Sequence, residues 1–239
     1  MRGSIVWLSE RDSPDAFPPV ERALREPDGL LAAGGDLSPA RLLAAYQRGI
    51  FPWYSYGQPI LWWCPDPRAI LMPRELRMTR SLAKSMRNKG METRVDTAFK
   101  EVIQACGSEA VRPGGTWLSP EMRAAYLRLH RLGYAHSIET WLGERLVGGL
   151  YGVAIGGVFF GESMFSVERD ASKIALSRLC TFLIECDFHM IDCQMATPHL
   201  LSLGAQLMPR TQFIQLLASH ASSDASAQRW RDHAVAPAH

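Results

Sequence analysis

The segment 134–165 constrains the fold most strongly, because it reads as three consecutive strands joined by short turns. Apolar and β-branched side chains dominate its three runs, and turn residues interrupt them at Leu142-Gly143-Glu144 and at Ile155-Gly156-Gly157. The uncharged stretch 146–161 is short for a membrane span, which needs about 20 residues. We therefore predict a three-stranded antiparallel meander.

Helix-start signals lie on both sides of this meander. Ser38-Pro39, Ser119-Pro120 and Thr197-Pro198 each place a capping hydroxyl before a proline, which favours a first helical turn. Met190–Met195 is a further strand-length segment. Apolar spacing and capping signals together predict helices over 40–48, from Thr79, over 96–106, from Ser119 to Gly133, and over 171–186, 198–203 and 209–219.

Composition limits the class of protein. The 239 residues are 47% hydrophobic and 21% charged, which predicts a packed core in one large domain or two unequal ones. The five cysteines show no CxxC spacing, so we expect reduced thiols, a cytoplasmic location and no metal site. The apolar run Ile5–Leu8 is too short for a signal peptide, and no membrane association is expected.

Asp66-Pro67-Arg68 is a plausible domain boundary. It predicts a small N-terminal domain over 1–67 and a larger domain over 68–239. The tail after about residue 220 is rich in Ala and Ser, and we expect it to be disordered.

An aromatic cluster precedes this boundary. Trp53, Trp62 and Trp63 lie close in sequence, together with Tyr54 and Tyr56. One interpretation is a small aromatic core. The other is a stacking platform for a planar ligand such as a nucleobase.

Positive charge is concentrated just after the boundary. Residues 68–100 hold nine basic and three acidic side chains, a local charge of +6 against +2 for the whole chain. Arg80, Lys84 and Arg87 share one face of the helix expected from Thr79, and Arg77 lies just before it. They form either a solvated helix face or a contact surface for phosphates.

Candidate reacting groups are found on two strands. In 190–195 the side chains of Asp192 and Gln194 are expected on the same face, where a carboxylate and a carboxamide can orient an amine and polarise a carbonyl. The alternative is an ordinary surface strand. Glu162 ends an otherwise apolar strand and needs a partner there, so a salt bridge is its simplest explanation.

The segments in sequence order resemble the leucyl/phenylalanyl-tRNA–protein transferases of bacteria. That family moves leucine or phenylalanine from its tRNA to the N-terminal arginine or lysine of a protein, which marks the protein for degradation. The matching segments are GLLAAGGDLSPARLLAAYQRGIFPWY (29–54), WWCPDPR (62–68), GTW (115–117), YLRLHRLGYAHSIETW (126–141), LVGGLYGV (146–153), FFGESMFS (159–166), ASKIAL (171–176), IDCQ (191–194), and SLGA with PR (202–210).

The resemblance implies an α+β fold, in which a small N-terminal domain precedes a GCN5-related N-acetyltransferase-like domain with a mixed, largely antiparallel sheet flanked by helices. The donor ester is already activated, so it implies no cofactor and no metal. The implied partners are leucyl-tRNA, phenylalanyl-tRNA and proteins with N-terminal arginine or lysine. We expect a monomer.

The resemblance also implies roles for the reacting groups. Asp192 would orient the acceptor amine or act as its base, and Gln194 would hydrogen-bond at the ester or the amine. Glu162 would hold either the donor's free α-amino group or the acceptor's basic side chain.

Substrate-binding residues follow in the same way. The terminal adenosine would stack near Trp53 and Trp117, with Tyr126 nearby, and the acceptor-stem phosphates would meet Arg77, Arg80, Lys84 and Arg87. The implied apolar pocket for the leucine or phenylalanine side chain is lined by Leu150, Phe159, Leu176, Leu179, Leu183 and Ile191.

Three other functions remain as alternatives. An acyl-CoA-dependent N-acetyltransferase would need a glycine-containing turn for pyrophosphate before the helix 171–186, and Glu168-Arg169-Asp170 offers no glycine there. A non-catalytic tRNA-binding protein would not depend on Asp192. A cell-wall enzyme that uses aminoacyl-tRNA is disfavoured by the short chain.

Overall fold

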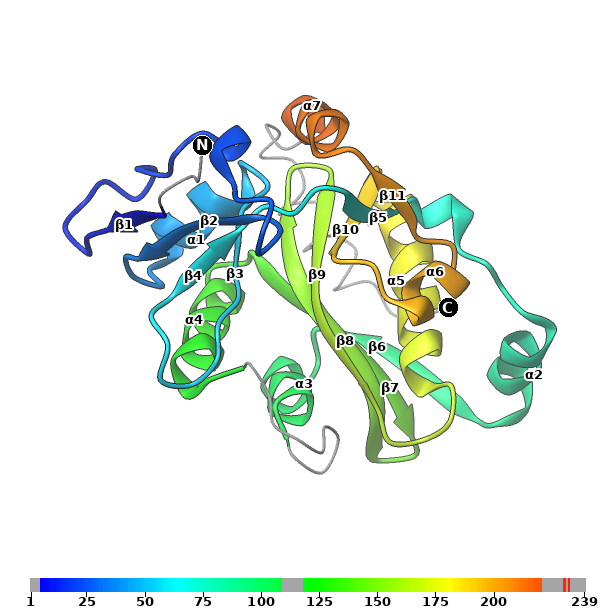
Figure 1. Ribbon diagram of the computed structural model, residues 1–239. Coiled ribbons are helices and arrows are strands. Elements are labelled where there is room, and N and C mark those ends of the chain that lie inside the picture. Colours follow the sequence, from blue (N-terminus) through cyan, green and yellow to red (C-terminus); the bar gives the residue numbers. More distant parts are fainter. Residues whose placement is uncertain (1–4, 109–117, 221–229, 231, 233–239) are drawn as a thin grey trace.

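The computed structural model describes residues 5–108 and 118–220, together with 230 and 232. Its described strands form two sheets, a small one near the N-terminus and a larger twisted one (Figure 1). In the small sheet β1 pairs with β2 in parallel, and the other pairs are antiparallel. Its strands, in spatial order, are β1 (Val6–Leu8), β2 (Leu30–Gly34), β4 (Leu61–Trp63) and β3 (Phe51–Pro52).

The larger sheet is mixed and mostly antiparallel, as expected. The predicted meander is confirmed as β7, β8 and β9, and the one parallel pair among the described strands of this sheet joins β9 to β10. The spatial order is β11 (Gln206–Met208), β5 (Arg68–Leu71), β10 (Met190–Gln194), β9 (Val158–Ser166), β8 (Arg145–Ile155), β7 (Ala135–Leu142) and β6 (Met91–Val95).

Strands β9 and β10 pair over only a short distance and then separate. Their register covers Met190–Asp192 against Val158–Phe160. Beyond it, β10 shifts register against β5 between Asp192 and Gln194, and Gln194 has a φ of 63°. A bulge of this kind redirects the side chains that follow it. The sheet therefore opens between these two strands.

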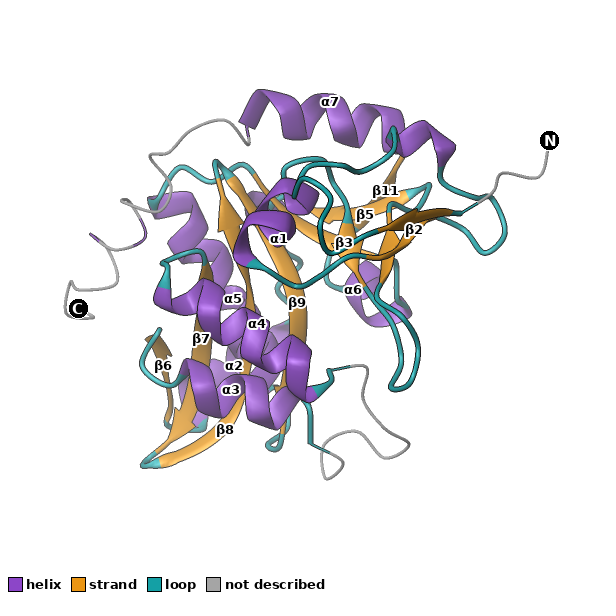
Figure 2. Cartoon of the chain, turned by 90° about the vertical axis from the view of Figure 1, so that its left-hand side faces the viewer, coloured by secondary structure: helices purple, strands orange, loops and turns teal. Residues whose placement is uncertain are grey.

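The helices cover both faces of the larger sheet. Neighbouring glycines of β8 show the two sides, since a Cβ on Gly148 would meet Ala171 of α5, whereas one on Gly149 would meet Val102 of α3. Figure 2 views the molecule from the side of α3 and α4. The helices are α1 (Pro39–Tyr46), α2 (Arg80–Asn88), α3 (Phe99–Cys106), α4 (Pro120–Arg131), α5 (Ala171–Glu185), α6 (Pro198–Ser202) and α7 (Arg210–His220), with short 3-10 turns at Val20–Arg22 and Pro73–Glu75.

The predicted caps are present at four helix starts. The side chains of Ser38, Thr79, Ser119 and Thr197 each accept a backbone N–H in the first turn. Helix α3 differs, because Ala98 occupies its cap position. There Glu139 of β7 accepts the backbone N–H groups of Thr97 and Ala98, so a distant strand caps the helix.

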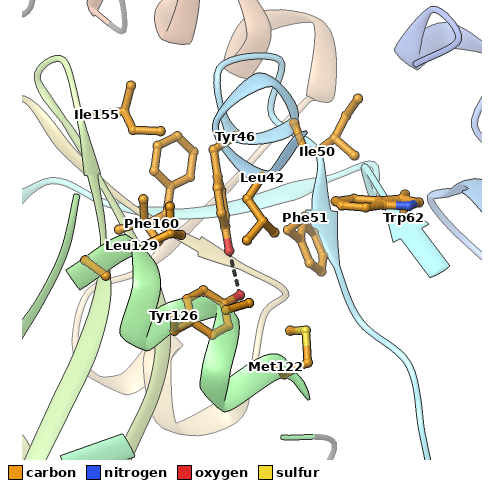
Figure 3. Close-up of a cluster of buried hydrophobic side chains, with 14 of the residues drawn as sticks. Leu42, Tyr46, Ile50, Phe51, Trp62, Met122, Tyr126, Leu129, Ile155 and Phe160 are labelled. Carbon is orange, nitrogen blue, oxygen red and sulfur yellow. Dashed lines mark hydrogen bonds between the residues drawn. The ribbon is translucent and has the colours of Figure 1, made fainter. Parts of the chain in front are cut away.

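The hydrophobic core continues across the predicted boundary at residue 67. Leu42 and Tyr46 of α1 pack with Phe160 of β9 and with Met122 and Tyr126 of α4 (Figure 3). The small sheet and the larger one thus share buried side chains. The division into domains at 67 stays a prediction.

Trp230 is a described residue within the tail after about residue 220, for which we expected disorder. This side chain is 1% exposed and packs against aromatic residues of the larger domain. A large apolar ring gains free energy on leaving water, which composition averaged over the Ala- and Ser-rich tail conceals. The rest of that tail, apart from Asp232, lies outside the described residues. No helix in the described part of the chain is long and apolar enough to cross a membrane.

Candidate active site

A cavity of about 350 Å³ lies where β9 and β10 separate. Strand β3 and helices α5 and α6 complete its wall. The base is apolar and is formed by Leu150, Phe159, Leu176, Leu179 and Ile191. The polar lining residues are Glu162, Ser163, Gln194, Thr197 and His199. Glu162 and Gln194 are hydrogen-bonded to each other and define the polar side of the cavity.

The structure brings together five of the six residues expected to line an apolar pocket. Leu183 is the exception, since it is not among the described residues that line the cavity. It is fully buried in the core behind α5, in the same cluster as Leu179. Leu183 lies one helical turn after Leu179 on the same face of α5, so it extends the buried cluster beyond the residues that line the cavity.

Glu162 is the centre of the polar side. Its Oε1 accepts hydrogen bonds from the Tyr46 hydroxyl at 2.7 Å and from Gln194 Nε2 at 2.9 Å. Its Oε2 accepts one from the Tyr126 hydroxyl at 2.7 Å. Burial raises the pKa of Glu162 to about 7, against the hydrogen bonds from the two tyrosines, which lower it. A carboxyl group with this pKa can exchange a proton near neutral pH.

The two tyrosine hydroxyls also contact each other at 2.7 Å (Figure 3). Three oxygen–oxygen contacts thus join Tyr46, Tyr126 and Glu162, but the two hydroxyls supply only two protons. A proton on Glu162 would fill the third contact. The geometry therefore agrees with a carboxyl group that holds a proton readily.

Asp192 lies beneath the cavity and is not among the described residues that line it. Its carboxylate and the guanidinium of Arg68 form two hydrogen bonds of 2.8 and 2.6 Å, and both side chains are fully buried. Arg68 in turn lies between the rings of Phe51 and Phe213, at 4.8 and 4.7 Å. The expectation that Asp192 meets the acceptor amine directly does not fit this placement.

Asp192 instead contacts the backbone of Gln194. Its Oδ1 accepts the Gln194 N–H at 2.9 Å, and this bond supports the positive φ of Gln194. A left-handed backbone is costly for a residue other than glycine and needs such support. Asp192 thereby aims the Gln194 amide at Glu162.

The tryptophans of the aromatic cluster differ in burial. Trp62 is fully buried, packs against Phe17 and forms part of the core. Trp53 is 38% exposed at the cavity edge, where the ring of Trp63 supports it at 5.5 Å. Trp117 lies outside the described residues.

Tyr126 was expected near the stacked adenosine, and it contacts a residue that lines the cavity. Its ring is fully buried, and its hydroxyl donates a hydrogen bond to Glu162. The place of Tyr126 near a bound adenosine stays a prediction.

The four basic residues of the expected phosphate surface are exposed. Arg77, Arg80, Lys84 and Arg87 form no salt bridge with an acidic residue in the described part of the chain. Arg77 also donates its backbone N–H to Leu203, next to the helix that carries His199. The basic surface therefore begins near one wall of the cavity. No group of three or more described His, Cys, Asp or Glu residues is placed to hold a metal.

The residues that hold Glu162 and Asp192 in place, Tyr46 and Arg68, were not predicted as site residues from the sequence. Neither were Ser163, Thr197 and His199 of the cavity wall. Tyr46 and Arg68 both lie within the motif segments, which was the available signal. Their partners, however, are 116 and 124 residues away in the chain, and no local spacing reveals such pairs.

Comparisons with known proteins add a family to this geometry. Residues 70–218 match the model of the leucyl/phenylalanyl-tRNA protein transferase family, and residues 35–66 match the model of its N-terminal domain. The chain belongs to this family. It is therefore a transferase of the aminoacyltransferase class.

Curated relatives agree along most of the chain. A leucyl/phenylalanyl-tRNA–protein transferase from Azoarcus sp. is 63% identical over 87% of this chain and 88% of its own length. A second, from Aromatoleum aromaticum, is 60% identical over 95% and 94% of the two chains. These values leave little of either relative unmatched.

Similar solved structures are distant. A protein titled a GCN5-related N-acetyltransferase from Kribbella flavida matches with 11% identity and a TM-score of 0.38, over 72% of this chain and 61% of that one. A protein of unknown function from Bacteroides thetaiotaomicron matches with 14% identity and a TM-score of 0.45, over 57% and 53%.

Proposed function

We propose that this transferase moves leucine or phenylalanine from aminoacyl-tRNA to the N-terminal arginine or lysine of an acceptor protein, which marks that protein for degradation. The observation that carries the proposal is the apolar cavity base directly beside the Glu162–Gln194 pair. An aliphatic or aromatic side chain fits the base. The reacting ester then lies at the polar side.

The reaction needs no group beyond the two substrates and the protein. The nitrogen of the acceptor α-amine attacks the ester carbonyl carbon, a C–N bond forms, and the bond from that carbon to the terminal ribose oxygen breaks. The amine loses one proton and the ribose oxygen gains one. The enzyme must therefore orient the amine and move a proton over a short distance.

Glu162 is the group best placed to move this proton. Its Oε2 accepts one hydrogen bond from a described residue, which leaves a lone pair for an amine proton. Its pKa of about 7 lies near that of an α-amine, about 8. In the proposed reaction Glu162 accepts the amine proton as the C–N bond forms and returns it to the ribose oxygen.

Gln194 and Asp192 have supporting roles in this reaction. The Gln194 amide nitrogen is bound to Glu162, which leaves its amide oxygen to accept the other amine hydrogen. Asp192, held by Arg68, fixes the Gln194 backbone and acts as a positioning residue.

The tRNA is expected on the outer side of the cavity. Trp53 at the rim offers a face for the terminal adenine. The exposed cations Arg77, Arg80, Lys84 and Arg87 would contact acceptor-stem phosphates, which position the tRNA without reading its sequence. We still expect this protein to be a monomer located in the cytoplasm.

The first test is a transfer assay with radiolabelled leucyl-tRNA and a protein that begins with arginine, in wild type and in Glu162→Gln. Loss of the base should lower kcat about 100-fold or more, and Tyr56→Phe, an exposed residue away from the cavity, should match wild type. Acetyl-CoA serves as the control donor. Acetyl transfer in place of leucyl transfer would sink the proposed function, and a fully active Glu162→Gln variant would sink only the assignment of the base.

A further inference from the structure

Trp230 lies behind the apolar base of the cavity, against Phe159. Its indole is stacked nearly parallel to the ring of Phe159, with the ring centres 5.7 Å apart and an angle of 13° between the planes. Phe182 of α5 and Phe188 flank it at 4.6 and 6.1 Å. Because Phe159 lines the cavity, Trp230 supports a residue that a bound side chain would touch.

A polar contact fixes the orientation of the indole. Its Nε1 donates a hydrogen bond of 2.8 Å to Asp96 Oδ2, which also contacts His136 Nδ1 at 2.7 Å. The imidazole of His136 stacks on the indole at 4.1 Å. A buried indole that both donates a hydrogen bond and stacks on another ring has one favoured position.

The acceptor itself is held in place. Asp96 follows β6, has a φ of 54° and accepts the backbone N–H of Ser137 through its other oxygen. This left-handed residue joins the edge of the sheet to the C-terminal segment. The contact is thus a formed site for the indole rather than chance burial.

We infer that Trp230 is a positioning residue for the cavity base, and that its contact with Phe159 limits how large a donor side chain the cavity accepts. The inference rests on the proposed transfer of leucine and phenylalanine. Trp230 also lies beyond residues 70–218, which the family model matches. The limit on donor size would then come from outside the part of the chain that defines the family.

Removal of the indole has a directional consequence. In Trp230→Ala a void opens behind Phe159, and its ring can tilt back into the void. The cavity deepens, so a leucine side chain fits it less closely while a phenylalanine ring has more room. For two substrates that differ by one methylene group, a hydrophobic pocket changes the ratio of their kcat/KM values by roughly tenfold or more.

The experiment compares kcat and KM for leucyl-tRNA and phenylalanyl-tRNA in wild type and Trp230→Ala, with N-terminal arginine as acceptor. We expect the KM for leucyl-tRNA to rise about tenfold, and the kcat/KM ratio of phenylalanyl to leucyl donor to rise roughly threefold or more. Trp7→Ala, which changes a tryptophan that is 69% exposed, is the control and should leave the ratio unchanged.

Two further variants keep the test decisive. Trp230→Phe keeps a ring behind Phe159 but loses the N–H, so its Tm should fall while its donor ratio stays near wild type. If Trp230→Ala does not fold, Trp230→Leu replaces it in the assay. A folded Trp230 variant without a ring but with the wild-type donor ratio overturns the inference. Failure of wild type to use either donor overturns the proposed function instead.

Discussion

The carboxylate of Asp192 influences the reaction through its charge as well as through Gln194. Together with burial, this charge raises the pKa of Glu162, because two nearby carboxylates disfavour each other's ionisation. Asp192→Asn removes the charge, so the pKa of Glu162 should fall below about 7. In a plot of kcat/KM against pH, the fall in activity on the acid side should then occur at lower pH. The value of kcat should also fall, because Gln194 is less well oriented.

The same substitution leaves the guanidinium of Arg68 buried without its counter-charge. Loss of one partner of a buried ion pair costs about 3–5 kcal/mol, so the Tm should fall and the assay should be run well below it. Asp187→Asn, an exposed aspartate just before β10, is the matched control. If Asp192 were itself the base, the fall in activity on the acid side would disappear rather than shift.

Residue-scale contacts also show what the sequence could reveal. The hydroxyl caps at Ser38, Ser119 and Thr197 were predictable, because each acts on a backbone N–H a few residues away. The pairs Tyr46–Glu162 and Arg68–Asp192 were not, because only the folded chain brings them together. Motif resemblance marked the segments without indicating which side chains would meet.

At the scale of elements, the bulge in β10 decides the geometry of the site. Strict alternation predicted Asp192 and Gln194 on one face of a regular strand. The shift between them places Asp192 beneath the sheet opening and Gln194 at its edge. A single irregular residue in a short strand leaves no periodic signal in the sequence.

Strand β7 contributes a pH-dependent contact to α3 through Glu139. This residue is fully buried, and burial raises its pKa from 4.5 to about 7. The folded state therefore keeps a proton that the unfolded state loses as the pH rises from 4.5 to 7. Over that range the free energy of unfolding should decrease by about 3 kcal/mol through this one group.

Glu139→Gln removes this titration, and its amide oxygen can still accept one of the two N–H groups, of Thr97 and Ala98, that the two carboxylate oxygens accept before α3. The difference in unfolding free energy between pH 4.5 and pH 8, from urea denaturation, should become smaller than in wild type by about 3 kcal/mol. The exposed Glu144→Gln, in the turn after β7, should behave as wild type. An unchanged pH dependence in Glu139→Gln would show that Glu139 ionises normally in the folded protein.

At the scale of the whole molecule, the cavity depends on both sheets. Phe51, Pro52 and Trp53 from the small sheet line it, and Tyr46 of α1 reaches Glu162 across the shared core. The predicted boundary at residue 67 rests on the segment Asp66-Pro67-Arg68. The sequence does not reveal the contacts that cross it, and a description of residues 68–239 alone would leave Phe51, Pro52 and Trp53 out of the cavity wall.

The charge distribution outside the cavity leads to a prediction for the whole enzyme. The net charge of the chain is only +2, yet Arg80, Lys84 and Arg87 are all exposed on α2. This helix lies to one side of α5 (Figure 1). If Arg80, Lys84 and Arg87 neutralise phosphates of the tRNA, the counterions of those phosphates are released when the tRNA binds. Replacing all three with glutamine should weaken tRNA binding and lower the slope of log Kd against log salt by roughly 0.9 for each phosphate that is no longer neutralised.

The triple variant Arg11→Gln, Arg22→Gln and Arg131→Gln removes the same charge from exposed positions elsewhere and should keep the wild-type slope. Equal slopes for the two triple variants would mean that overall charge, and not the surface formed by α2, attracts the tRNA.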